Sequence, residues 1–370
     1  MKVLVTGAKG FVGRNLCLTL EQMPDVEVLK YDLGDEAKLD GYAAECDFVM
    51  HLAGVNRPKD PAEFKTGNTV FTEDILEKLA ARQSPPPVLL SSSIQAVLDN
   101  DYGKSKAAAE EAVRAYGTKT GAPVFIYRLA NVFGKWCRPN YNSAVATWVY
   151  NIARDLPIMV RDPAATVTLV YIDDVVRSFA SCLAAKNAND AKIYSIEPSY
   201  TKTLGEIVEL IKSFHDEPQN LIVPDQADGF TKKLYSTYLA ALPEDKFSYP
   251  LTMHCDNRGS FTEVLHSAER GQVSVNVSKP GIAKGQHWHH TKHEKFLVVS
   301  GKGEINFRVA DNPNGSVITY KVSGEKLEVV RIPPGYTHNI VNVGDTDMVT
   351  LMWANEVFDP ANPDTFRLEV

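Results

Sequence analysis

The sequence of 370 residues contains no long hydrophobic run, no paired cysteines and no excess of positive charge. Without a long apolar run no membrane span is predicted, and the short apolar stretch at the N-terminus does not fit a signal peptide, so a cytoplasmic protein is expected. The five cysteines are scattered and lack a C-x-x-C pair, which indicates reduced thiols and argues against a disulfide framework. A formal net charge of -7 argues against binding to nucleic acid or to an anionic membrane.

What is present indicates two globular domains. Hydrophobic residues make up 44% and charged residues 23% of the chain, which is long enough for each domain to bury its own core. Helix and strand patterns alternate up to the cluster ALPEDKFSYP, after which short alternating runs such as QVSVNVS and MVTLMWA follow. We therefore predict an α/β domain over residues 1–245 and an all-β domain over residues 246–370.

Three glycines follow the first predicted strand with the spacing G-x-x-G-x-x-G. Gly7, Gly10 and Gly13 separate the apolar residues 2–6 from an apolar helix, and such a turn presents backbone N–H groups and a helix N-terminus to a pyrophosphate. A second apolar strand, residues 26–31, ends at Asp32, where a carboxylate can bind the ribose of an adenosine. The pattern predicts a dinucleotide site on a Rossmann-type sheet.

This glycine spacing resembles that of the short-chain dehydrogenase/reductase (SDR) superfamily, and the later segment HLAGVNRP resembles the motif after its third strand. The resemblance implies NADPH as cofactor, with NADH as the alternative. Asp32 favours NADH by accepting from the ribose 2′-OH, whereas Lys9 and Lys30 fit a 2′-phosphate. The implied cofactor contacts are Gly7, Lys9, Gly10, Phe11, Val12, Gly13, Asp32, Leu52, Ala53 and Gly54.

A tyrosine and a lysine follow a strand that ends in serines, in VLLSSSIQAVLDNDYGKSK. Tyr102 and Lys106 are spaced to share one face of a helix, and a nearby ammonium lowers the pKa of a phenol from about 10 toward working pH. Such a tyrosine can exchange a proton with a carbinol oxygen. The resemblance to extended SDR enzymes implies that a serine completes the catalytic set, with Ser93 the first choice and Ser92 the second, and that Tyr102 and Lys106 also contact the cofactor.

Two later segments resemble motifs of extended SDR enzymes that act on sugars attached to nucleoside diphosphates. The segment RLANVFGKW places Asn131 where the resemblance implies contact with the nucleotide-sugar, and VTLVYIDDVV places Asp173 at the late strand motif. Asp173 and Asp174 fit equally well as the acidic first turn of a helix, which the helix dipole favours. The amphipathic stretch TLGEIVELIKSF is expected to be a helix that closes the sugar pocket.

The predicted all-β domain contains a histidine-rich segment that is hard to explain by packing. His287 and His289 leave the same face of a strand, and a following turn returns Glu294 beside them. His338 follows the turn PPGYT on a later strand. Three imidazoles and one carboxylate suit zinc, and would also accept iron, nickel or manganese.

These spacings resemble both motifs of the cupin superfamily. The matched positions are Gly281, His287, His289, Glu294, Gly301, Pro333, Gly335, His338 and Asn342, while a further glycine of the family pattern is replaced by Leu327. The resemblance implies a jelly-roll barrel over residues 246–370 that holds a metal ion on the three histidines and the glutamate.

The segment DNRGSFTEV resembles the opening of the cupins that epimerise deoxy-4-ketohexoses on a nucleotide. Arg258 has the fork geometry that suits a diphosphate, and an ion pair with Glu263 is the alternative. Tyr336 precedes His338 closely and is expected to line the substrate pocket.

Nearly end to end, the chain resembles the bifunctional CapF enzymes of capsular-polysaccharide precursor synthesis, in segments such as GAKGFVG, LSSSIQA, YSTYL and HWHHTK. The resemblance implies that the cupin domain epimerises C3 of a UDP-2-acetamido-2,6-dideoxy-4-hexulose. The N-terminal domain would then reduce C4 with NAD(P)H to the L-talose product, on the route to UDP-N-acetyl-L-fucosamine. A homodimer is expected.

Two other functions stay open at this point. The first is a metal-dependent oxygenase fused to an unrelated dehydrogenase, against which the segment DNRGSFTEV argues. The second is a reductase whose zinc cupin is not catalytic and serves dimerisation or sugar sensing. Epimerisation before reduction is chemically coherent, because a ketone at C4 acidifies the proton on C3.

Overall fold

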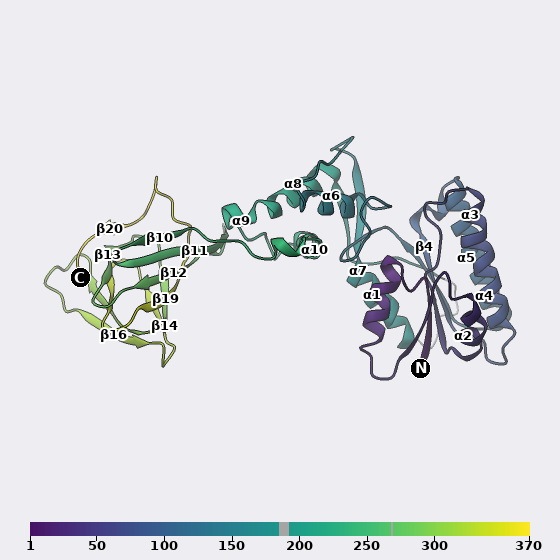
Figure 1. Cartoon of the computed structure of the whole chain (residues 1–370), viewed down its shortest axis with the longest axis horizontal. Coiled ribbons are helices and arrows are strands. Elements are labelled where there is room, and N and C mark those ends of the chain that lie inside the picture. The colour runs from purple at the N-terminus through teal and green to yellow at the C-terminus, as the bar shows by residue number, and fades with distance from the viewer. Residues whose placement is uncertain (185–191, 268) are drawn as a thin grey trace. The chain divides into compact units, whose positions relative to one another are not determined.

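The computed structural model describes residues 1–184, 192–267 and 269–370, and the chain forms two compact units (Figure 1). The first unit comprises Met1–Lys212 and Asp228–Pro243, and the second comprises Ser213–Ala227 and Glu244–Val370. The expected boundary at residue 245 lies close to Glu244, where the chain enters the second unit for the last time. The assignment of Ser213–Ala227 to the second unit differs from the single boundary that we expected.

A six-stranded parallel sheet forms the middle of the first unit, in the order β2-β1-β3-β4-β5-β8. The strands are β1 (Lys2–Thr6), β2 (Glu27–Tyr31), β3 (Phe48–His51), β4 (Val88–Ser93), β5 (Val124–Leu129) and β8 (Ile193–Tyr194). The inner strands β1, β3, β4 and β5 are mostly buried because helices cover both faces of the sheet. The strand order reverses between β1 and β3, and ligands bind at the carboxyl ends of the strands at such a point.

Helices lie on both sides of this sheet (Figure 1). On one side are α2 (Leu39–Glu45), α4 (Phe71–Ala80) and α5 (Asp101–Thr120), and on the other are α1 (Phe11–Leu20) and α7 (Ile172–Ser181). Leu4, Val49 and Leu90 of the sheet belong to one buried core with Ile75 of α4 and Val113 of α5. This core fixes α5 against the sheet, and α5 carries the predicted tyrosine and lysine.

The start of α5 is set by its cap. The side chain of Asn100 accepts a hydrogen bond from the Gly103 N–H at 2.7 Å, and the helix ends at Gly121 in the left-handed conformation, with φ 74°. An N-terminal cap of this kind contributes about 1 kcal/mol. The cap fixes the helix register from its first turn, where Tyr102 lies.

Smaller elements complete the first unit. A short helix α3 (Ala62–Phe64) and a π-helical turn η2 (Lys65–Val70) precede α4, and a second sheet joins β6 (Asn131–Phe133), β7 (Thr166–Tyr171) and β9 (Ser199–Thr203). The remaining elements are η1 (Glu36–Lys38), η3 (Ile94–Val97), α6 (Ala144–Ile152), η4 (Cys182–Ala184) and α10 (Gly229–Leu239). The predicted amphipathic helix is confirmed as α8 (Leu204–His215), which runs from the first unit into the second.

Two antiparallel sheets form the second unit, with the orders β10-β11-β12-β19-β14-β17 and β16-β15-β18-β13-β20. The strands are β10 (Met253–Asp256), β11 (Gly259–Ser267), β12 (Gly271–Ser278), β13 (Ala283–Trp288), β14 (Glu294–Ser300), β15 (Lys302–Val309), β16 (Ile318–Ser323), β17 (Val329–Ile332), β18 (Tyr336–Asn342), β19 (Met348–Ala354) and β20 (Phe366–Arg367). Phe296 and Val298 of the first sheet belong to one core with Ile305, Phe307 and Ile340 of the second. The all-β prediction is confirmed.

Backbone pairing explains why residues 213–227 belong to the second unit. The Val223 N–H donates to the His266 carbonyl at 2.8 Å, and the His266 N–H donates to the Leu221 carbonyl at 2.9 Å. The short helix α9 (Glu217–Asn220) precedes this pairing, and the turn η5 (Glu244–Lys246) begins the second stretch of the unit. Among the described residues no helix is long and apolar enough to cross a bilayer. The five cysteines are free, as predicted.

Candidate functional site

The glycine turn between β1 and α1 is built as predicted. The Gly10 N–H donates to the Gly7 carbonyl at 3.0 Å, and a Cβ at position 13 would lie only 2.0 Å from that carbonyl oxygen. Only glycine therefore lets the N-terminus of α1 approach the turn so closely. Because the N-cap Gly10 has no side chain, the first N–H groups of α1, at Phe11 and Val12, are available to a phosphate.

A cavity of about 310 Å³ lies beside this turn, and among its lining residues are Lys9, Arg14, Lys30 and Asp32. The Asp32 carboxylate accepts from the Lys9 N–H at 2.6 Å and from the Leu33 N–H at 2.9 Å. A carboxylate in this place can also meet the ribose of an adenosine, as predicted. The position of Asp32 therefore fits a dinucleotide.

The cations of this cavity differ in how they are held. Lys30 forms an ion pair with Glu21 at 2.5 Å, while Lys9 lies 3.7 Å from Asp35 and stays largely exposed. The guanidinium of Arg14, which we did not predict, lies 4.6 Å from the centre of the Trp136 ring. Arg14 comes from the first turns of α1, so its spacing from the glycine motif could have indicated it.

The backbone after β3 is held close to the glycine turn. The N–H groups of Leu52 and Ala53 both donate to Thr6 Oγ1 at 3.2 Å. A Cβ on Gly54 would lie 2.8 Å from Asn68 Oδ1 and 3.0 Å from Lys106 Nζ, so glycine lets this loop lie against α5. Leu52, Ala53 and Gly54, which are predicted to contact the cofactor, thus lie between β1 and Lys106.

Ser93, Tyr102 and Lys106 come together at the carboxyl end of β4. Ser93 is the last residue of β4 and accepts from the Gln95 N–H at 3.1 Å, and its side chain hydrogen-bonds with Tyr102. The Lys106 ammonium donates to the Ser91 carbonyl at 3.2 Å and lies 6.0 Å from the centre of the Tyr102 ring. The three side chains predicted to act together therefore meet.

The pKa of Tyr102 departs from our expectation. Burial raises it above its ordinary value, and the hydrogen bond with Ser93 lowers it without offsetting burial. Lys106 does not produce the expected lowering in this structure, because its ammonium binds the Ser91 carbonyl and is itself disfavoured by burial. Burial lowers the pKa of Lys106 to about 8, while the charge of Glu110 acts in the opposite direction.

Asn131 lies on β6, and the two aspartates of the late strand motif lie on α7. Asn131 begins β6, is exposed, and donates its amide to a backbone carbonyl of β7 at 3.2 Å. Asp173 and Asp174 lie in the first turn of α7, where Asp173 pairs with Lys135 and Asp174 pairs with Lys233 at 2.6 Å. The alternative interpretation of the two aspartates, as the acidic start of a helix, is therefore confirmed by their position.

The four predicted metal ligands converge in the second unit. One possible ligand atom from each of His287, His289, Glu294 and His338 lies within 4.8 Å of the others. His287 and His338 are paired across β13 and β18, and Glu294 begins β14. Its Oε2 lies 3.4 Å from His289 Nε2 and 3.3 Å from His338 Nε2. Strands of both sheets therefore contribute to one cluster.

The buried atoms of this cluster fit a cation. His289 Nε2, Glu294 Oε2 and both ring nitrogens of His338 are buried without a hydrogen-bond partner, which is costly unless another group satisfies them. Burial lowers the pKa of His287 to about 4. Burial acts to raise the pKa of Glu294, but the adjoining His289 and His338 lower it overall. Neutral imidazoles and an ionised carboxylate are the forms that bind metals.

His287, Glu294 and His338 line a cavity of about 300 Å³ that also receives Arg258 and Lys284. Further lining residues include His254, Asp256, Phe261, Asn276 and Met352. Two cationic side chains thus share one pocket with the candidate metal ligands.

The position of Arg258 excludes one of its two predicted partners. Its guanidinium binds Asp256 Oδ2 through Nε at 2.9 Å and through a terminal nitrogen at 2.6 Å. The alternative ion pair with Glu263 is wrong, because Glu263 pairs with His266 instead. Arg258 therefore lines the cavity and keeps an exposed side chain, as a ligand for an anion requires.

Lys284 was not predicted. Its ammonium donates to Asn276 Oδ1 at 2.7 Å and to the Val277 carbonyl at 2.9 Å, and burial lowers its pKa. It lies on β13 ahead of His287, so the strand that carries the histidines could have pointed to it.

Tyr336 lies outside the set of residues that line this cavity. It begins β18, is partly buried and packs against the apolar core between the two sheets. It is not among the residues that line the cavity with Arg258, so its contact with the substrate stays a prediction. The tyrosine heads the strand, where its side chain meets apolar neighbours, while the histidine on the same strand faces the metal cluster.

Comparison with known families defines the class of protein. The "NAD dependent epimerase/dehydratase family" matches residues 3–196, and the "Polysaccharide biosynthesis C-terminal domain" matches residues 254–366. A solved UDP-glucuronic acid 4-epimerase from Bacillus cereus in complex with NAD has the fold of the first unit. It is 21% identical with a TM-score of 0.53, covering 58% of this chain and 83% of its own.

Full-length relatives then place the chain within that class. A UDP-2-acetamido-2,6-beta-L-arabino-hexul-4-ose reductase from Pseudomonas aeruginosa is 48% identical over 100% of this chain and 99% of its own length. The crystal structure of the capsular polysaccharide assembling protein CapF from Staphylococcus aureus is 50% identical, with a TM-score of 0.93 and complete coverage of both chains. The chain therefore belongs to the CapF family, and it is an enzyme with reductase activity.

Proposed function

We propose that this enzyme converts a UDP-2-acetamido-2,6-dideoxy-4-hexulose in two steps. The second unit, as a cupin, would epimerise C3, and the first unit, as an extended SDR reductase, would reduce C4 to the L-talose product on the route to UDP-N-acetyl-L-fucosamine. One observation carries the proposal: the cluster of His287, Glu294 and His338 shares a cavity with two cations, apart from the separate site of Tyr102 and Lys106. The substrate named for the Pseudomonas aeruginosa relative supports it.

In the reductase site, bound NADPH would supply the hydride for C4, with NADH as the alternative. Tyr102 would donate a proton to the oxygen on C4, a contribution of about two to four orders of magnitude in rate. The hydroxyl of Ser93, already hydrogen-bonded with Tyr102, would hold that oxygen in place. Lys106, beside the backbone of Gly54, would bind the cofactor ribose.

In the epimerase site, His287, His289, Glu294 and His338 would hold a divalent cation, for which we propose zinc. When bound, the ion would act as a Lewis acid that stabilises negative charge on the C4 oxygen. The acidic proton is the one on C3, because the neighbouring carbon is a ketone.

We propose that the diphosphate of the substrate pairs with Arg258 and Lys284. Both cations line the cavity of the metal cluster, and a guanidinium binds a phosphate through two parallel hydrogen bonds. Asn131 remains a proposed contact to the nucleotide-sugar in the first unit. It is exposed, so its amide is accessible to a ligand.

Product analysis by NMR tests this function. The full chain is mixed with the 4-keto sugar in deuterated water, with and without NADPH. We expect deuterium at C3 without the cofactor and the reduced L-talose sugar with it. Chelation of the metal is expected to stop exchange at C3. A metal-loaded protein that reduces C4 without any exchange at C3 would instead identify the second unit as a non-catalytic module.

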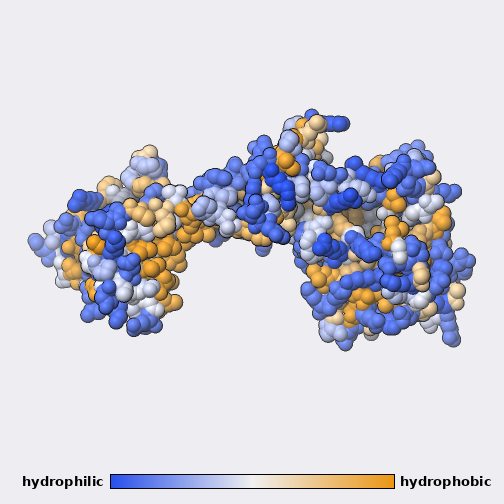
Figure 2. Space-filling model, in the orientation of Figure 1, coloured by the Kyte–Doolittle hydropathy of each residue, from blue (hydrophilic) through white to orange (hydrophobic). Residues whose placement is uncertain are grey.

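We also propose that the second unit forms a homodimer through the outer face of its first sheet. Val275, Leu351, Leu297 and Val329 follow one another in register across β12, β19, β14 and β17. Leu351 is 38% and Val329 54% exposed, and Figure 2 shows hydrophobic side chains gathered over β12, β19 and β14. An exposed apolar patch of this kind is typical of a protein interface.

Light scattering after size-exclusion chromatography tests the dimer. Leu351→Asp is expected to shift the protein toward the monomer, because a carboxylate would be buried unpaired at the interface. Val343→Asp is the control, since Val343 is also exposed and does not belong to the set of apolar residues in register across β12, β19, β14 and β17. A Leu351→Asp protein that stays dimeric would contradict the assignment. A cytoplasmic location remains a prediction, which the five free thiols support.

A further inference from the structure

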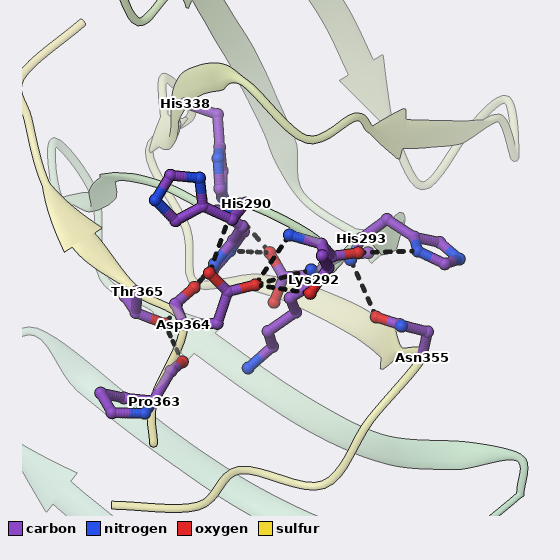
Figure 3. A network of polar contacts seen from close by, with 11 residues as sticks. His290, Lys292, His293, His338, Asn355, Pro363, Asp364 and Thr365 are labelled. Carbon is purple, nitrogen blue, oxygen red and sulfur yellow. Dashed lines mark hydrogen bonds and ion pairs between the residues drawn. The ribbon is translucent and has the colours of Figure 1, made fainter. Parts of the chain in front are cut away.

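The C-terminal segment is tied to the histidine turn by one carboxylate. Asp364 accepts the backbone N–H of His290 on Oδ1 at 2.9 Å and those of Thr291 and Lys292 on Oδ2 at 2.8 Å (Figure 3). The Thr291 hydroxyl also donates to Oδ2 at 3.1 Å. One side chain thus satisfies three successive backbone donors of the turn that joins His289 to Glu294.

The backbone of the same residue meets a candidate metal ligand. His289 Nδ1 lies 2.6 Å from the carbonyl oxygen of Asp364. A carbonyl oxygen can only accept, so Nδ1 carries a hydrogen, and in the neutral ring Nε2 then keeps its lone pair. Nε2 is buried without a hydrogen-bond partner and lies 3.4 Å from Glu294 Oε2. The carbonyl therefore sets the tautomer in which His289 can bind a metal.

Asp364 adopts an uncommon backbone conformation to do this. Its φ is 38°, a region that costs a residue with a side chain on the order of 1–3 kcal/mol unless its surroundings hold it there. The hydrogen bonds from three backbone N–H groups to its carboxylate keep Asp364 in this conformation. Thr365 Oγ1, whose hydroxyl donates to the Pro363 carbonyl at 2.8 Å, is the more distant acceptor for His289, at 3.5 Å from Nδ1.

We propose that Asp364 is a positioning residue of the metal centre, which sets the metal affinity through the orientation and tautomer of His289. The inference rests on the proposed function, in which His289 is a metal ligand. A group that binds the second nitrogen of a ligating histidine usually contributes about 10- to 100-fold to metal affinity. Asp364 does so through its backbone carbonyl, and its side chain keeps that carbonyl in place.

The test measures zinc affinity of the full chain by competition with a chromophoric chelator. Asp364→Gly removes the carboxylate without placing a Cβ in the strained conformation, and we expect affinity to fall about 10- to 100-fold. Asp359→Ala is the matched control: Asp359 lies in the same segment, and its carboxylate accepts from the Ala361 N–H at 2.9 Å. We expect its affinity to equal that of the wild type.

A second measurement separates positioning from general loosening of the fold. At a pH where the His289 ring is neutral, long-range ¹H–¹⁵N NMR of the metal-free wild type is expected to show His289 as the Nδ1–H tautomer. In Asp364→Gly the signals are expected to move toward a mixture of tautomers, while the His287 signals stay unchanged. Asp364→Asn keeps the shape and one acceptor oxygen, and it provides the comparison if the glycine variant folds poorly. We expect its affinity to lie between those of wild type and glycine variant.

The outcomes distinguish this inference from the proposed function. If the wild type binds no zinc with measurable affinity, the metal function fails whatever Asp364 does. If the wild type binds zinc, and Asp364→Gly and Asp364→Asn bind it equally tightly with His289 in the same tautomer, the positioning role is overturned while the metal function stands.

Discussion

The Ser92 hydroxyl donates a hydrogen bond to Glu110 Oε1 at 2.5 Å, in the interior of the first unit. The same carboxylate accepts from Arg128 through both of its oxygens, at 2.9 and 2.7 Å. Ser92 thus helps to join β4, α5 and β5. The neighbouring Ser93 points to the other side of the strand, as alternate residues do, and hydrogen-bonds with Tyr102. Two adjacent serines therefore have different roles.

Alanine substitutions of the two serines should separate stability from catalysis. Ser93→Ala is expected to lower the rate of C4 reduction about 10- to 100-fold, because a hydrogen bond to a developing charge contributes roughly 1.5–3 kcal/mol. Ser92→Ala should leave that rate near wild type and lower the free energy of unfolding by about 1–3 kcal/mol, since Glu110 loses a buried donor. Single-turnover reduction and urea unfolding measure the two effects. Equal loss of reduction in both variants, with unchanged stability, would contradict the division.

Removal of one metal ligand should abolish proton exchange at C3 and leave the reductase activity of the first unit unchanged. In His287→Ala we expect the exchange of the C3 proton to stop, because one of three imidazoles is lost. The reduction of an already epimerised ketone should continue at the wild-type rate, since the reductase residues lie in the other unit. His290→Ala is the control, because His290 is exposed and lies outside the ligand set. Deuterium that still enters C3 in metal-free His287→Ala would refute the ligand assignment.

Features with local spacing could be predicted from the sequence. The glycine turn, the pair of Tyr102 and Lys106, and the two histidines beside Glu294 each lie within one element or one turn, so the periodicity of that element places them. His338 was found because a turn and a strand signal accompany it. The order of an α/β unit and an all-β unit could also be predicted. The sequence pattern changes from alternating helices and strands to short strands alone, and this change marks the change of fold.

Contacts between distant segments could not be predicted. Asp364 and His289 lie 75 positions apart, and no periodicity relates them. The pairing of residues 221–223 with His266 likewise depends on tertiary structure. The packing of Tyr336 against the core could not be predicted either, because nearness to His338 in sequence does not say which neighbours a side chain meets.

His51 should make the stability of the first unit depend on pH. It is buried between the hydroxyls of Thr6, at 2.8 Å, and Thr72, at 2.9 Å, and burial lowers its pKa to about 3. Between that value and the ordinary value near 6.5, the unfolded chain binds a proton that the folded chain excludes. This contribution to stability is therefore complete above pH 6.5 and is lost as pH falls, by up to about 1.4 kcal/mol per unit.

The comparison with His51→Gln isolates this effect. The amide can hydrogen-bond to both hydroxyls and does not titrate, so the advantage of the wild type should shrink from pH 7 to pH 4. Urea unfolding of both proteins after chelation of metal measures the difference and removes any contribution from metal loss at low pH. Stability curves that run parallel over this range would show that His51 does not carry the dependence.

The cofactor preference should depend on the cavity beside Asp32. We predict a higher kcat/KM with NADPH than with NADH, because Lys9 and Arg14 line this cavity and can bind a 2′-phosphate. Arg14→Met is expected to lower kcat/KM for NADPH about tenfold or more and to leave NADH nearly unchanged. Lys30→Met is the matched control, because Lys30 is already paired with Glu21. A higher kcat/KM with NADH in the wild type would overturn this prediction.

Tyr102→Phe should stop reduction and leave epimerisation running, so that an epimerised 4-keto sugar accumulates. The ring, the helix and the cofactor site remain, but the oxygen on C4 loses its proton donor, which lowers the rate by about two to four orders of magnitude. Lys106→Ala should be at least as damaging, because its ammonium lies beside both the tyrosine ring and the Gly54 backbone. The measurement is single-turnover reduction at saturating cofactor, with C3 exchange followed in parallel. Wild-type reduction by Tyr102→Phe would mean that the proton donor of the first unit is another group.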